Sequence, residues 1–184
     1  MGNRVVIYDK TASPAILPMM WGMGKFLHGG ISFGVTSWDQ AYRLLLDFSS
    51  SQEIDHLQIW SHGHQYGPII GDKTLEMQYL PKLNDMLGWQ WRPMAVTPSR
   101  TIWFRSCSIA SNPIWMEHAA RTFKCPVAGH TQVISSPNPL QQKGFVVLMP
   151  DEQAQWGLQE GASISTLTME LPWKKGRSWL HTTQ

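Results

Sequence analysis

The sequence predicts a three-layer α/β sandwich with a mainly parallel central sheet. Short apolar runs, typical of buried strands, alternate along the chain with segments in which apolar residues recur at helical spacing. This order of strand, helix, strand, helix is typical of a sheet covered by helices. A length of 184 residues suits one domain over 1–184, and we expect 170–184 to be a tail or an edge element.

The first half of the chain is predicted to hold two strands, one helix and a hairpin. Ser37 is a good N-cap, and Gln40 three residues later completes a capping box. Gly71 supplies a turn between two short apolar runs. We therefore expect, in order, a strand over 4–8, a long loop over 14–33, a helix over 38–48, a strand over 56–61 and a hairpin over 68–74.

The second half continues the alternation. Pro81 and Pro113 each suit the first turn of a helix, and Asn112 is an N-cap for the second of these helices. From Glu152 onward the pattern weakens. We expect a short helix from Pro81, a connection over 89–99, a strand over 101–104, a helix to about Lys124, and strands over 127–130 and 144–149.

Composition narrows the classes of partner. Charged residues make up 15% of the chain, below the roughly 25% usual for a soluble domain, and there are ten tryptophans. Both features favour an oligomer or a larger complex, because tryptophan is enriched at interfaces. The net charge of +2 and the lack of a long basic run argue against nucleic-acid binding, and no apolar run is long enough for a membrane span.

The N-terminal residues and the two cysteines indicate the compartment. Residues 1–10 lack the apolar segment and the cleavage site of a signal peptide. Two cysteines in an unexported chain are expected to be reduced thiols. We therefore expect a cytoplasmic protein, and no feature of the sequence calls for a cofactor.

Two predicted strands end in residues that can do chemistry. His62 follows the strand over 56–61, and Cys107 follows the strand that begins at Thr101. If these strands are parallel neighbours, both side chains emerge at the same edge of the sheet, where ligands of open parallel sheets bind. An imidazole beside a thiol can take its proton and later protonate a leaving amine. Gly63 would allow a turn and leave backbone N–H groups free for an oxyanion.

The segments around these two residues resemble caspases and their bacterial relatives. Ile59-Trp60-Ser61-His62-Gly63 resembles their strand that ends in Ser-His-Gly, and Ile102-Trp103-Phe104-Arg105-Ser106-Cys107-Ser108 resembles their nucleophile strand. The order of histidine before cysteine and the separation of 45 residues also fit that family. The residues around Cys107 differ from the caspase signature, and the likeness is greater to bacterial caspase-like domains.

The resemblance implies a cysteine peptidase that cleaves peptide bonds through an acyl-enzyme. His62 would be the general base and Cys107 the nucleophile, with the backbone of Gly63 and Cys107 as oxyanion donors. Ser61 and Arg105 would line the substrate pocket, where Arg105 favours an acidic group before the scissile bond. The substrate would be a peptide or a protein.

Four alternatives remain open from the sequence. His130 follows a strand and could line the same pocket, or it could be structural. His64 could replace His62 as the base, or both could bind a metal ion with Cys107 or His130 in a metal-dependent hydrolase. The fourth is a caspase-like module without catalysis, which binds a peptide or protein partner.

Overall fold

A six-stranded sheet forms the centre of the protein. The computed structural model describes residues 3–22, 30–88, 100–134 and 144–155. All neighbouring strands are parallel except the last pair, β8 and β9. The strands lie in the order β2 (Ile31–Val35), β1 (Asn3–Asp9), β3 (Ile54–Trp60), β7 (Thr101–Arg105), β8 (Val127–His130) and β9 (Phe145–Leu148).

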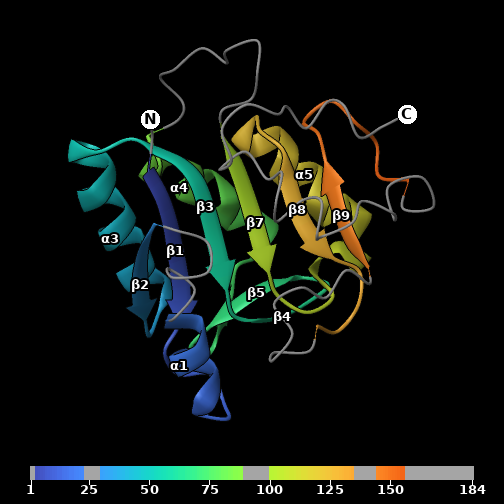
Figure 1. Cartoon of the computed structure of the whole chain (residues 1–184). Coiled ribbons are helices and arrows are strands. Elements are labelled where there is room, and N and C mark those ends of the chain that lie inside the picture. The colour runs from blue at the N-terminus through green and yellow to red at the C-terminus, as the bar shows by residue number, and fades with distance from the viewer. Residues whose placement is uncertain (1–2, 23–29, 89–99, 135–143, 156–184) are drawn as a thin grey trace.

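Helices cover both faces of this sheet, and the predicted α/β sandwich is confirmed. Figure 1 shows helices behind the sheet and a further helix in front of it, near the carboxyl ends of the parallel strands. The larger core lies between the sheet and the helices behind it. These are α3 (Trp38–Ser51), α4 (Leu80–Met86) and α5 (Pro113–Phe123), and the helix in front is α1 (Ile16–Gly22).

The helix ends follow the predicted caps with one difference. The Ser37 side chain accepts a hydrogen bond from the Gln40 backbone N–H at 3.3 Å, and Asn112 accepts one from Trp115 N–H at 3.3 Å. The Gln40 side chain, however, accepts from Thr36 N–H at 2.9 Å and so completes the cap one residue earlier than a capping box does.

The predicted loop over 14–33 is wrong in two places. Residues Ile16–Gly22 form α1, and Ile31–Val35 form the edge strand β2. Leu17 and Trp21 of α1 are buried against Val6 and Trp60 on the front face of the sheet. A helix of this length is marginal by itself, so packing on the sheet stabilises it more than its own composition does.

A second, three-stranded sheet lies beyond the carboxyl ends of β3 and β7 (Figure 1). It consists of β4 (His62–His64), β5 (Gly67–Ile70) and β6 (Lys73–Thr74), all antiparallel. The predicted hairpin is confirmed, with Gly71 at a φ of 65° in its turn. A 3-10 turn, Met77–Tyr79, then leads into α4. None of the helices in the described ranges is long and apolar enough to cross a membrane.

The expectations for 89–99 and 170–184 fall outside the described residues.

Candidate active site

The strands that precede His62 and Cys107 end side by side. β3 and β7 are parallel, and the last registered pair is Trp60 with Arg105. His62 and Cys107 each follow two residues later, so the backbone leaves both strands at the same edge. The premise of neighbouring parallel strands is therefore confirmed. The candidate active site is the edge of the sheet at the carboxyl ends of β3 and β7.

Gly63 packs directly on the end of β7. A Cβ at this position would lie 2.6 Å from the Ser106 Cβ and 3.4 Å from the Cys107 carbonyl oxygen. Gly63 belongs to strand β4, so the expectation that it makes a turn is wrong. Glycine is required here because two backbones approach closely, and this contact joins the histidine segment to the cysteine segment.

The His62 ring is held in one orientation. Its Nε2 lies 3.0 Å from the Ser13 carbonyl oxygen, and its edge packs on the Trp21 ring with centroids 6.0 Å apart. Because a carbonyl oxygen only accepts, Nε2 is the nitrogen that donates a proton to this bond, and in that tautomer Nδ1 is the acceptor. The Ser13 loop is itself ordered by Asp9, whose Oδ1 accepts from the Thr11 N–H at 2.8 Å.

Cys107 is partly exposed at the start of a strained turn. Its sulfur contacts the Ile134 carbonyl oxygen at 3.9 Å. Ser108 has a φ of 53°, in the left-handed region, and its N–H donates to the Gln132 carbonyl oxygen at 3.0 Å. Among the described residues, no hydrogen bond joins the His62 ring to the Cys107 sulfur. The two groups share one edge of the sheet, and the hydrogen bond of a working dyad is not formed.

Arg105 is a buried cation stacked on aromatic rings. Its guanidinium lies 4.4 Å from the centroid of the Trp60 ring and 5.3 Å from that of the Trp103 ring. Burial lowers the pKa of Arg105 to about 10, so the side chain is still charged at neutral pH. Its Nη1 is buried and has no hydrogen-bond partner in the part of the chain that is described. A buried cation of this kind favours an anionic ligand.

Ser61 and His130 are both buried. Ser61 Oγ donates to the His62 carbonyl oxygen at 2.8 Å and lies 3.1 Å from Ser106 Oγ. The His130 ring contacts the rings of Trp103 and Phe145, with centroids 6.3 and 5.3 Å away. Ser61 thus orders the start of β4, and His130 lies beside the aromatic group that holds Arg105. Their contact with substrate stays a prediction.

Both ring nitrogens of His64 are bonded within the small three-stranded sheet. Its Nδ1 accepts from the Tyr66 backbone N–H at 3.1 Å, and its Nε2 lies 3.3 Å from Thr74 Oγ1. Both nitrogens are therefore used, which favours His62 as the base. In the described segments no three histidine, cysteine or acidic side chains gather as a metal site would need. These contacts argue against a metal-dependent hydrolase built on His64.

Two contributions to the site were not predicted from the sequence. The Ser13 carbonyl oxygen orients the His62 ring, and Trp21 of α1 packs on that ring. A backbone carbonyl has no signature in a sequence. The Trp21 contact depends on α1, which lies in the segment expected to be a loop.

Comparison with known proteins does not test the resemblance to caspases, which stays a prediction from the segments around His62 and Cys107. No protein-family model matches the chain, and no curated protein matches its sequence.

Proposed function

We propose that this protein is a thiol-dependent peptidase in which Cys107 is the nucleophile and His62 the general base. The observation that carries the proposal is the register of β3 on β7, which brings the two residues out of adjacent strands at the same sheet edge. The packing of Gly63 on Ser106 supports it, because it fixes the two segments against each other.

The chemistry follows from the orientation of the His62 ring. Nε2–H is held by the Ser13 carbonyl oxygen, so Nδ1 takes the proton of the Cys107 thiol. The thiolate attacks the scissile carbonyl carbon, and His62 returns the proton to the leaving amine as the thioester forms. Water then hydrolyses the thioester to a carboxylic acid and regenerates the thiol. The backbone N–H groups of Gly63 and Cys107 are the proposed oxyanion donors, since Ser108 N–H is already bonded to Gln132.

Arg105 supports a preference for an acidic residue before the scissile bond. Its guanidinium is buried beside the rings of Trp60 and Trp103, and its Nη1–H is available to donate a hydrogen bond to a ligand. A carboxylate that reached it would gain a charge-assisted hydrogen bond in a site of low dielectric. A glutamate or aspartate side chain is therefore the proposed group at this position.

Selective labelling of the two cysteines tests the peptidase. Cys125 is an internal control, because it is buried and burial raises the pKa of its thiol. A thiol-directed acylating probe is expected to label Cys107 and to lose that labelling in His62→Ala. His64→Ala is the matched variant, and labelling there should persist. Equal labelling of Cys107 and Cys125 in the folded protein would contradict the proposal.

One observation favours a second candidate, a peptide-binding module without turnover. In the described residues the His62 ring contacts Ser13 and Trp21 and makes no hydrogen bond to the Cys107 sulfur. Catalytic hydrogen bonds are often long before substrate binds, so the peptidase requires that this bond forms in the complex with substrate, whereas the module does not. A degenerate peptide library separates them: binding of acidic peptides without cleavage, equal in Cys107→Ser, would establish the module.

A further inference from the structure

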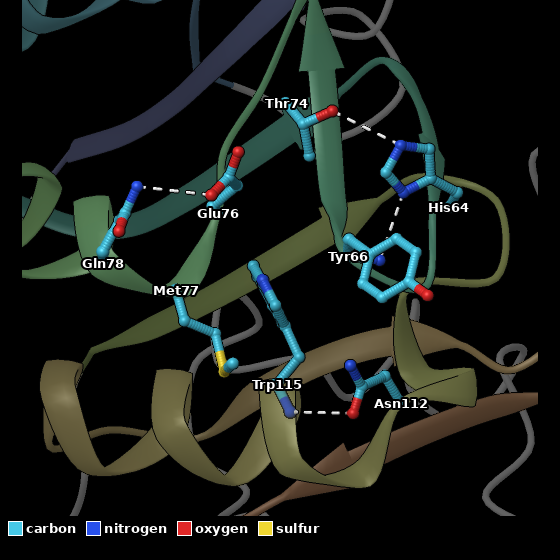
Figure 2. A pocket seen from close by; sticks show the side chains of 8 residues that line it. All are labelled: His64, Tyr66, Thr74, Glu76, Met77, Gln78, Asn112 and Trp115. Carbon is cyan, nitrogen blue, oxygen red and sulfur yellow. Dashed lines mark hydrogen bonds between the residues drawn. The ribbon is translucent and has the colours of Figure 1, made fainter.

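A cavity of about 470 Å³ lies between the small sheet and the start of α5 (Figure 2). Both of its walls continue from the candidate active site. His64 lies two residues after His62, and Asn112 lies five residues after Cys107. A peptide whose scissile bond reached Cys107 would therefore pass close to this cavity. Its lining consists of His64, Tyr66, Thr74, Glu76, Met77, Gln78, Asn112 and Trp115.

The cavity contains a buried donor that has no acceptor among the described residues. Trp115 is 1% exposed, and its indole Nε1–H has no hydrogen-bond partner within the described segments. Figure 2 shows the ring rising from α5 into the space below Glu76, with its nitrogen away from the helix backbone. By contrast, the Trp38 and Trp60 indoles donate to Lys73 O at 2.9 Å and to Gln58 Oε1 at 2.8 Å. A buried donor left unpaired is unfavourable, so a ligand that accepts from Trp115 gains from that bond.

The Trp115 ring is held in place before any ligand arrives. It packs edge-on against Phe104 of β7 with ring centroids 4.9 Å apart, and its backbone N–H is capped by Asn112. A donor that is already oriented loses little freedom on binding.

The other lining groups define the chemistry of the ligand. Both His64 nitrogens are bonded within the hairpin, and Glu76 is a carboxylate that accepts from Gln78 Nε2 at 3.3 Å. Among the described residues that line the cavity there is no lysine or arginine. A ligand that ends in an anionic group would be repelled by Glu76. A ligand that ends in an ammonium group could not accept a hydrogen bond from Trp115. The rings and the thioether of the walls suit an aromatic stem that ends in a neutral acceptor.

We propose that this cavity binds a tyrosine side chain of the peptide substrate, with the phenol oxygen accepting a hydrogen bond from Trp115 Nε1–H. The phenol ring would lie against Tyr66 and Met77, and its hydroxyl proton could be donated to Glu76. A phenylalanine would fill the same space and leave the indole donor unpaired. The inference rests on the proposed function for the statement that the tyrosine belongs to a substrate.

The test uses the full chain with Cys107→Ala, so that binding is measured without catalysis. N-acetyl-tyrosinamide and N-acetyl-phenylalaninamide are titrated while the indole N–H resonances of the ten tryptophans are followed by NMR. The Trp115 resonance is identified by its loss in Trp115→Phe or, if that variant does not fold, by its shift in Tyr66→Ala. N-acetyl-tyrosinamide should move this resonance downfield. N-acetyl-phenylalaninamide should bind roughly fivefold more weakly, or more weakly still. The Trp60 indole, already bonded to Gln58, should not move.

The rim residue Tyr66 provides a matched control. It is exposed, and Tyr66→Ala should weaken both ligands while the fold is kept. Equal affinity for the two ligands, or no shift of Trp115 up to the solubility limit, would overturn the inference. Cys107 labelling tests the peptidase separately: binding of tyrosinamide without labelling refutes the peptidase alone, and labelling without binding refutes the tyrosine site alone.

Discussion

Replacing Gly63 by alanine tests the contact that joins the two halves of the candidate active site. The new methyl group would lie 2.6 Å from the Ser106 Cβ, about 1 Å closer than two carbon atoms pack. Ser106 is fully buried and its Cβ is fixed to the backbone of the β7 end, so relief requires movement of the backbone. Overpacking of this kind costs about 1–3 kcal/mol. For a chain of this size that corresponds to a melting temperature roughly 2–12 °C lower.

Thermal unfolding and the rate of Cys107 labelling measure this effect together. Ser106→Gly removes the opposing Cβ, so the double variant should recover stability relative to the sum of the two single changes. Gly88→Ala is the control: its φ is +64°, and apart from its chain neighbours no atom of the described residues lies within 4 Å of the added Cβ. There only the left-handed backbone is penalised, and labelling of Cys107 should not change. A Gly63→Ala protein with unchanged melting temperature and labelling rate would refute the close packing of β4 on β7.

Three further predictions follow from single contacts. Burial and Arg4 lower the pKa of His56 to about 4. Unfolded histidine titrates near 6.5, so stability should be full above that pH and fall by about 3 kcal/mol as the pH drops to 4. Urea unfolding should show a weaker pH dependence in His56→Gln, and parallel profiles would contradict this. Asn112→Ala should lower the unfolding free energy by about 1 kcal/mol through loss of the α5 cap, with Asn112→Asp close to wild type; equal losses would exclude the cap. Arg105→Met should keep the melting temperature and abolish the preference for acidic peptides, whereas a retained preference would exclude Arg105 as its source.

The sequence predicts the inner strands of the central sheet well because they are buried on both faces, whereas the edge strand β2 is mostly half-buried and was not predicted. All five residues of β7 are buried, so the apolar run from Thr101 has no polar interruption before Arg105. The cap residues Ser37 and Asn112 likewise mark helices through a bond that each side chain makes locally. Apolar runs and helix caps depend on residues that are close together in the sequence, and the structure confirms both.

The parts that were not predicted depend on contacts between distant segments. α1 is short and packs on Trp60, which lies about forty residues further along the chain. The choice between His62 and His64 depends in part on such contacts. Both follow the same strand, but the His64 ring bonds to Thr74 and to the nearby Tyr66 N–H, whereas the His62 ring bonds to the carbonyl oxygen of Ser13, 49 residues earlier. The contacts with Ser13 and Thr74 depend on how the strands pair, which the residues around each histidine do not show.

The alternation of side chains along β7 separates the two proposed recognition groups. Phe104 faces α5 and holds Trp115, whereas Arg105 faces the opposite side and stacks on Trp60. A peptide that crosses the sheet edge at Cys107 would therefore meet the acidic-residue site and the tyrosine site on different faces. Groups this separate should act independently, so the losses in peptide affinity from Arg105→Met and Tyr66→Ala should add within about 0.5 kcal/mol. Binding measurements on a peptide that carries both residues test this additivity. A larger coupling would mean that the two side chains contact one group of the ligand, which the geometry of β7 does not allow.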